Sequence, residues 1–285
     1  MKKKLLTGII ATVVLVTAVV GLSGCGKSSS SAEKGSTVTL AGSTSVQPLT
    51  EAFGEKYMED NPDVTIEAQG GGSGQGVKAI ETNIADIGSL SREVKEEEKT
   101  ALKKEYVIAQ DGVAVVVNSE VKVDNLSMDQ IMKIYTGKIK NWKEVGGTDK
   151  EITAVTREEG SGTRGAFTEI TGVLTKDDAG TETDNTTSKA LVQPSTGAVK
   201  ETVAKTPNSI GYMSIGALDD TVKAVKVDKV DATEENVLAK KYPISRPFLY
   251  AVGSEVTKEA QAFIDFALSQ EGQKIVKESG FIPVK

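Results

Sequence analysis

Three short clusters of glycine, serine and threonine could form an anion-binding site. They are GSTS at 42–45, GGSGQG at 71–76 and GSGT at 160–163. Each follows a predicted strand and precedes a predicted helix, where unpaired backbone N–H groups and a partial positive charge favour an anion. Glycine lets the backbone approach a ligand closely, and hydroxyl groups add small donors. Because one such cluster is more often plain helix capping, the prediction depends on all three together.

Two charged residues lie beside these clusters. Arg157 ends a predicted strand directly before the third cluster, and Glu159 follows it closely enough to hold its guanidinium group. The planar guanidinium fits a pair of oxygens on a tetrahedral oxyanion. The alternative is an ordinary arginine–glutamate pair at the surface.

Asp86 lies in the stretch IADIGSLSR at 84–92, inside the end of an apolar predicted strand. An ionised carboxylate can only accept hydrogen bonds. Beside a bound oxyanion, Asp86 would therefore accept a bond from protonated phosphate and repel sulfate, which carries no proton. A helix cap or an internal ion pair is the alternative for this residue.

The N-terminus has the pattern of a secretory signal peptide. Lys2, Lys3 and Lys4 precede an apolar run at 5–22, and small residues then precede Cys25. This order resembles a bacterial lipobox, in which Cys25 would be lipidated, and the serines at 28–31 would form a flexible tether. An uncleaved membrane helix is the alternative. Residues 21–28 also match a P-loop pattern, which we take as coincidence because the required strand and helix are absent from the prediction.

Composition limits the chemistry that the chain can perform. It contains one cysteine and no histidine, which excludes a Ser-His-Asp triad and a histidine-ligated metal site. The net charge is −6, and it becomes −9 without the three lysines of the signal peptide. This acidic balance argues against nucleic acid as a partner. An anion site would therefore have to be built locally, from backbone N–H groups and a few side chains.

Strands and helices alternate along the chain, which predicts an α/β protein with mainly parallel sheets. In such sheets ligands bind where strands end and helices begin. Strands are predicted at 37–41, 64–68, 84–88, 106–118, 152–156, 209–214, 222–227 and 242–252. Helices are predicted at 48–59, 93–105, 197–205, 258–268 and 271–278, after the second and third clusters, and at a capping box that opens with Ser127.

Six motifs, in this order, resemble the phosphate-binding proteins of bacterial phosphate ABC transporters, and the resemblance covers nearly all of the mature chain. The motifs are AGSTSVQPL (41–49), QGGGSGQGVKAI (69–80), ADIGSLSR (85–92), TREEGSGTRGAF (156–167), NSIGY (208–212) and YPISRPF (242–248). The resemblance implies a two-lobed fold of the periplasmic-binding-protein type II, with two crossover strands as a hinge. We place lobe 1 at 36–114 and 247–285 and lobe 2 at 115–246, after a signal peptide at 1–24 and a tether at 25–35.

The resemblance also implies the ligand contacts and the partners. The implied phosphate contacts are Ser43, Thr44, Ser45, Ser73, Asp86, Arg157, Ser161, Gly162 and Thr163, with Gly74 and Glu159 in support. The partners would be inorganic phosphate, the permease and ATPase subunits of an importer, and the membrane through the lipid on Cys25. The protein would be a monomer on the extracellular face of the cell membrane, without cofactor or metal and without enzymatic activity.

Two departures and three alternatives qualify this expectation. Some family members have aspartate where this chain has Glu159, and some have an aromatic residue at the position of Ser45. A receptor for sulfate, molybdate or tungstate is one alternative, and Asp86 argues against it. A secreted phosphatase or phosphotransferase would need a nucleophile with a base, or a metal cluster. A surface adhesin or sensor would leave the anion site unused.

Overall fold

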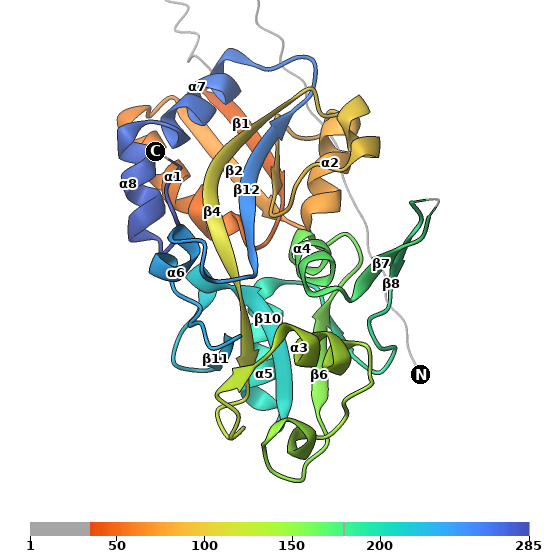
Figure 1. Cartoon of the computed structure of the whole chain (residues 1–285). Coiled ribbons are helices and arrows are strands. Elements are labelled where there is room, and N and C mark those ends of the chain that lie inside the picture. Colours follow the sequence, from red (N-terminus) through yellow and green to blue (C-terminus); the bar gives the residue numbers. More distant parts are fainter. Residues whose placement is uncertain (1–34, 179, 285) are drawn as a thin grey trace, which may run out of the picture. The chain divides into compact units, whose positions relative to one another are not determined.

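A long central strand, β4 (Lys104–Val117), belongs to both hydrophobic cores of the protein. The computed structural model describes residues 35–178 and 180–284. The first part of β4 pairs antiparallel with β12 (Ser245–Val252), and its last part pairs with β10 (Ser209–Ser214) and β11 (Lys223–Val227). Figure 1 shows β4 and β12 running side by side through the middle of the described residues.

The other strands join the same sheet or form a separate hairpin. The described residues form a ten-stranded sheet in the order β2-β1-β3-β12-β4-β10-β6-β9, in which β11 pairs with β4 and β5. The remaining strands are β1 (Ser36–Gly42), β2 (Val64–Gly70), β3 (Ile87–Leu90), β5 (Asn125–Leu126), β6 (Thr153–Arg157), β9 (Leu191–Gln193) and the hairpin strands β7 (Leu174–Lys176) and β8 (Glu182–Asp184).

Helices connect most of these strands. The α-helices are α1 (Gln47–Asp60), α2 (Ser73–Glu81), α3 (Met128–Tyr135), α4 (Gly162–Thr171), α5 (Thr196–Lys205), α6 (Glu234–Leu238), α7 (Lys258–Ala267) and α8 (Gln270–Glu278). Three short 3-10 helices are η1 (Glu96–Thr100), η2 (Trp142–Val145) and η3 (Ile215–Ala217). The predicted capping box is confirmed, because the Ser127 hydroxyl accepts from the N–H of Gln130 at 3.1 Å.

Parallel pairing predominates away from the central strands. β1 pairs in parallel with β2 and β3, and β6 pairs in parallel with β9 and β10. Antiparallel pairing involves β4, β12 and the β7–β8 hairpin. The predicted α/β class, with mainly parallel sheets flanked by helices, is confirmed.

Two large hydrophobic clusters divide the described residues. The first takes its side chains from the stretch between Val38 and Ala109 and from the stretch between Phe248 and Phe281. The second takes them from the stretch between Val113 and Ile244, together with one residue of the C-terminal segment. The chain therefore passes from one core to the other along β4, and returns just before the middle of β12.

One predicted helix is wrong. The charged segment 93–105 forms only the short η1, and β4 already begins at Lys104. The backbone of residues 104–107 pairs with residues 249–252 of β12, so sheet pairing overrides the local helix propensity of the glutamates and lysines. The predicted strand at 84–88 lies later, at Ile87–Leu90, and Ile84 is 75% exposed. Among the described helices, none is long and apolar enough to cross a membrane.

Candidate anion-binding site

The N-termini of four helices come together at one place in the structure. The turn before α1 contacts the N-termini of α4 and α5, and the N-terminus of α2 faces that of α4. Each helix directly follows a strand of the sheet, namely β1, β2, β6 or β9. β1 and β2 are parallel, so the turns before α1 and α2 lie at the same end of these strands. β6 and β9 are also parallel, so the turns before α4 and α5 likewise lie together.

Two backbone N–H groups at this meeting point have no partner among the described residues. Within the described chain, the N–H groups of Gly162 and Thr163 make no hydrogen bond, as expected for the first residues of a helix. Ser161 caps α4 by accepting from the N–H of Arg164 at 3.3 Å. The positive end of the α4 dipole and two free donors therefore lie together, which favours a bound anion.

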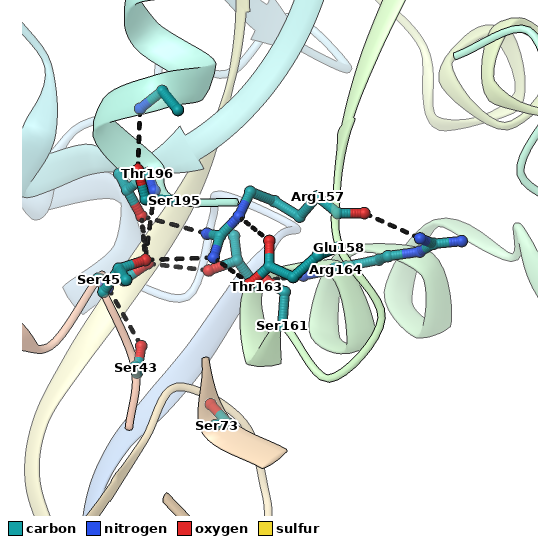
Figure 2. A network of polar contacts seen from close by, with 12 residues as sticks. Ser43, Ser45, Ser73, Arg157, Glu158, Ser161, Thr163, Arg164, Ser195 and Thr196 are labelled. Carbon is teal, nitrogen blue, oxygen red and sulfur yellow. Dashed lines mark hydrogen bonds and ion pairs between the residues drawn. The ribbon is translucent and has the colours of Figure 1, made fainter. Parts of the chain in front are cut away.

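Hydroxyl groups from three turns form a connected cluster. The Ser45 hydroxyl shares a hydrogen bond of 2.8 Å with Thr163 and one of 2.9 Å with Thr196. Thr44 accepts from the N–H of Thr196 at 3.2 Å. Figure 2 shows Ser45 meeting Thr163 and Thr196, with Arg157 beside them. The first and third predicted clusters are thus brought together, and the N-terminus of α5 joins them.

Arg157 is the buried cation of this cluster. Its guanidinium is 1% exposed and donates from Nη2 to Thr44 at 3.1 Å and from Nη1 to Thr196 at 3.3 Å. The same group makes a two-pronged ion pair with Glu158, at 2.8 Å and 2.7 Å. The supporting role expected of Glu159 is therefore taken by its neighbour, because the chain turns directly after β6 and leaves the side chain of Glu159 exposed.

The backbone of Arg157 is also fixed. Its N–H donates to the Tyr212 hydroxyl at 3.2 Å, and its carbonyl accepts from Arg164 at 2.8 Å. Tyr212 stacks on Phe167 of α4 with ring centroids 3.9 Å apart, and its hydroxyl shares a 2.7 Å bond with Thr156. Burial raises the pKa of Tyr212 to about 12, so its hydroxyl stays protonated around neutral pH. These contacts hold the guanidinium in a defined place, which a specific ligand contact requires.

A second hydroxyl group cluster faces the N-terminus of α4. Ser43 donates to the Ser91 hydroxyl at 2.8 Å, and the N–H of Ser91 donates to the Ser73 hydroxyl at 3.1 Å. All three side chains are buried. A β-carbon on Gly162 would overlap the Ser73 hydroxyl and lie 2.7 Å from the Ser91 hydroxyl, so only glycine fits this approach. The N–H of Gly74 adds a 2.9 Å bond to the carbonyl of Gly160.

Asp86 does not belong to this site. Its carboxylate accepts from the N–H and the hydroxyl of Thr39, each at 2.8 Å. It lies just before β3, whereas the clusters follow the other end of the parallel strands, where Gly42 pairs with Ser89. The sequence places a polar residue at each end of this short buried strand, and the strand direction brings Ser91 to the site instead of Asp86.

Ser91 and Thr196 are the site residues that sequence reasoning missed. Both had a usable signal, because Ser91 directly follows a buried strand and Thr196 lies in PSTG, another serine–threonine–glycine cluster that opens a helix. Cys25, the expected lipidation residue, lies outside the described residues. Within the described ranges, no group of three or more His, Cys, Asp and Glu residues could hold a metal ion.

The arrangement can bind a small oxyanion without chemical change. It offers one guanidinium, free helix N–H groups and several hydroxyl groups, which together can surround four oxygens. Its one contacting carboxylate, that of Glu158, is engaged by Arg157 at both oxygens. A bound anion would therefore meet mostly donors and hydroxyl groups.

Comparison with known proteins agrees with this architecture. The model of the PBP superfamily domain matches residues 27–271. Phosphate-binding protein PstS of Bacillus subtilis is 37% identical, and the match covers 99% of this chain and 94% of the relative. Phosphate-binding protein PstS of Borreliella burgdorferi is 31% identical, over 87% of this chain and 90% of the relative.

Solved structures give the same result. A phosphate ABC transporter substrate-binding protein from Clostridium perfringens, with bound phosphate, is 45% identical and has a TM-score of 0.82, covering 87% of this chain and 100% of that one. An ABC-type phosphate transport receptor from Vibrio cholerae is 37% identical with a TM-score of 0.72, over the same shares of the two chains. This chain therefore belongs to the PBP superfamily and, within it, to the PstS family.

Proposed function

We propose that this protein binds inorganic phosphate outside the cell and delivers it to an ABC-type phosphate importer. The observation that carries the proposal is the meeting of four helix N-termini around buried Arg157. The names of the relatives supply the ligand and the transporter, because they are phosphate-binding PstS proteins and phosphate transport receptors. These relatives are substrate-binding proteins, which favours a receptor over an enzyme.

The proposed phosphate contacts come from both core regions. They are Ser43, Thr44, Ser45, Ser73, Ser91, Arg157, Ser161, Gly162, Thr163 and Thr196. A dissociation constant near 1 μM corresponds to about −8 kcal/mol, and roughly ten hydrogen bonds with charge assistance could supply it after desolvation. Arg157 would supply the positive charge, while the helix N-termini would distribute further stabilisation over the oxygens.

Closure of two lobes would sequester the ion, a hinge motion of a known kind. We place lobe 1 at 36–114 and 247–285 and lobe 2 at 115–246. The two hydrophobic cores support these bounds. The chain leaves the first core between Ala109 and Val113 on β4 and re-enters it between Ile244 and Phe248 at the start of β12. The contact of Gly162 with Ser73 and Ser91 would then be made when the lobes close.

The protein would be held at the extracellular face of the membrane by a lipid on Cys25. The basic residues at 2–4, the apolar run and the small residues before Cys25 support this anchor. Replacing Cys25 with alanine should abolish the incorporation of labelled fatty acid into the protein, because the sulfur that would carry the lipid is gone. Equal labelling of Cys25→Ala and the wild type, or no labelling of the wild type, would contradict the lipid anchor. We expect a monomer that binds the permease and ATPase subunits of the importer.

A general oxyanion receptor is the second candidate, and the position of Asp86 favours it. The carboxylate expected to exclude sulfate bonds to Thr39 instead. Calorimetric titration of the purified protein, stripped of bound anion, with phosphate and then with sulfate separates the two candidates. One-to-one phosphate binding without sulfate heat supports the phosphate receptor. Equal binding of both supports the general receptor, and no heat from either contradicts both.

A further inference from the structure

A buried ion pair links the two crossover strands. Asp111 on β4 and Arg246 on β12 are register partners, and their side chains are 0% and 1% exposed. The guanidinium donates to the same Asp111 oxygen from Nε at 3.0 Å and from Nη2 at 2.9 Å. Burial raises the pKa of Asp111, and the charge of Arg246 opposes that shift. Two charges in such a place need each other, because an unpaired buried charge is strongly unfavourable.

The pair lies where the two cores meet. On β4, Ala109 packs in the first core and Val113 in the second, and Asp111 lies between them. On the partner strand, Ile244 packs in the second core and Phe248 in the first, and Arg246 lies between them. Both strands therefore carry a charged residue at the point where the chain passes between the cores. A hinge motion would bend the strands at this point.

Each partner also contacts a different side of the molecule. Ser214, at the end of β10, donates to the free oxygen of Asp111 at 2.7 Å. Arg246 donates from Nη1 to the carbonyl of Ser91 at 3.2 Å. The carbonyl of Ser91 is thereby fixed, while its N–H and hydroxyl engage Ser73 and Ser43 in the site. One hydrogen-bonded chain thus runs from β10 through the hinge to the anion site.

We infer that the Asp111–Arg246 pair is the pivot of lobe closure and positions Ser91 against the bound anion. This inference rests on the proposed function. The three donor nitrogens of Arg246 and the two oxygens of Asp111 hold both crossover strands and the Ser91 peptide in one geometry. A bend in the strands would turn about this fixed point, so that closure presents Ser91 in the same orientation each time.

The test replaces the pair with apolar side chains of similar size, in the double variant Asp111→Leu with Arg246→Met. Such a replacement leaves no unpaired buried charge, so the fold should be retained. The matched control is Arg92→Met with Glu98→Leu, which removes another largely buried two-pronged pair with bonds of 2.7 Å and 2.6 Å. Arg92 is adjacent to Ser91 in sequence but is not part of the crossover strands.

Phosphate affinity of the protein, measured by calorimetry, gives the first readout. We expect a loss of about tenfold or more for the Asp111–Arg246 replacement and wild-type affinity for the control pair. The second readout is coupling: Ser91→Ala should weaken binding in the wild-type background and have little further effect in the replaced background. A merely structural pair would not abolish the effect of Ser91→Ala.

Each outcome bears on a distinct conclusion. Wild-type affinity in the replaced protein, or an undiminished effect of Ser91→Ala there, would overturn the inference while leaving phosphate binding intact. Absence of phosphate binding by the wild type would overturn the proposed function and this inference with it. Should the double variant fail to fold, the phosphate affinity of Arg246→Lys is measured instead. One ammonium group cannot bond to Asp111 and to the Ser91 carbonyl as the guanidinium does, so we expect weaker binding. Wild-type affinity of that variant would likewise overturn the inference.

Discussion

Gly162 at the start of α4 lies directly against the Ser73 hydroxyl at the start of α2, with no room between them for a β-carbon. The two residues come from helices on different sides of the crossover strands, and Ser91 lies on the same side as Ser73. Close approach of these helix ends brings the free N–H groups of α4 next to three serine hydroxyls. Glycine is therefore required at this position for the close approach of the two helix ends.

Replacing Gly162 with alanine should weaken phosphate binding by at least about tenfold, or about 1.4 kcal/mol. The added methyl group would meet Ser73 and Ser91 and hold the helix ends apart. Calorimetric titration measures the loss. The control is Gly165→Ala on the same helix, where a β-carbon meets only the flexible side chain of Arg92 at 3.4 Å. Equal affinities of the two variants would show that close approach at Gly162 is not needed for binding.

Arg157→Ala should reduce phosphate affinity by about 2–4 kcal/mol, or roughly 30- to 1,000-fold. The variant loses a buried charged donor and leaves Glu158 as an uncompensated negative charge beside the anion. Lys200→Ala removes the same unit charge from a more exposed pair with Asp219, and should bind phosphate like the wild type. An unchanged affinity of Arg157→Ala in equilibrium dialysis would exclude Arg157 from the site.

Asp86→Asn should leave the ratio of phosphate to sulfate affinity unchanged. Its carboxylate accepts hydrogen bonds from Thr39 at the opposite end of β3 from Ser91. It therefore cannot accept a hydrogen bond from a protonated anion bound at the site. The variant should instead lose about 1 kcal/mol of unfolding free energy, because Thr39 donates both of its bonds to one oxygen of Asp86, and a neutral amide oxygen accepts them less strongly than an ionised carboxylate oxygen does. A changed ratio of the two affinities, measured by competition, would restore Asp86 to the site.

The stability of the protein should fall as the pH rises from 10 to 12, in part because of Tyr212. Burial raises the pKa of this residue from 10.0 to about 12, so the folded state holds a proton that the unfolded state releases. The resulting stabilisation is complete below pH 10 and is lost as the pH approaches 12, on the order of 3 kcal/mol in total. Urea unfolding of Tyr212→Phe should therefore show a shallower decline over this range.

The control for this measurement is Tyr106→Phe. Tyr106 is partly exposed and donates to Gln261 at 2.7 Å, away from the buried stack of Tyr212 on Phe167. This variant should keep the wild-type slope of unfolding free energy against pH. If the unfolding free energy of Tyr212→Phe fell as steeply with pH as that of the wild type and of Tyr106→Phe, the Tyr212 hydroxyl would not contribute to this decline. Burial also raises the pKa of Tyr135, Tyr242 and Tyr250, so some decline should remain in every variant.

Local sequence signals were sufficient for the helix ends of the site. The GSTS, GGSGQG and GSGT clusters predict helix N-termini because capping chemistry and apolar periodicity act over a few neighbouring residues. The same signal at PSTG marks the N-terminus of α5, although its role in the site was missed. The position of Arg157 beside the third cluster could also be predicted from the sequence, because Arg157 stands at the end of a buried strand, directly before the turn.

Local patterns in the chain were enough to predict the α/β class, the glycine, serine and threonine turns and the cation beside them. Which acids and hydroxyls reach that cation follows from long-range contacts in the fold. Asp86 and Ser91 flank the same short strand, and pairing with β1 settles which of them lies at the site. Asp111 and Arg246 are 135 residues apart, and only the register of β4 with β12 makes them partners. Capping and periodicity are local, whereas strand direction and register arise from pairing between distant segments, which no short stretch of sequence encodes.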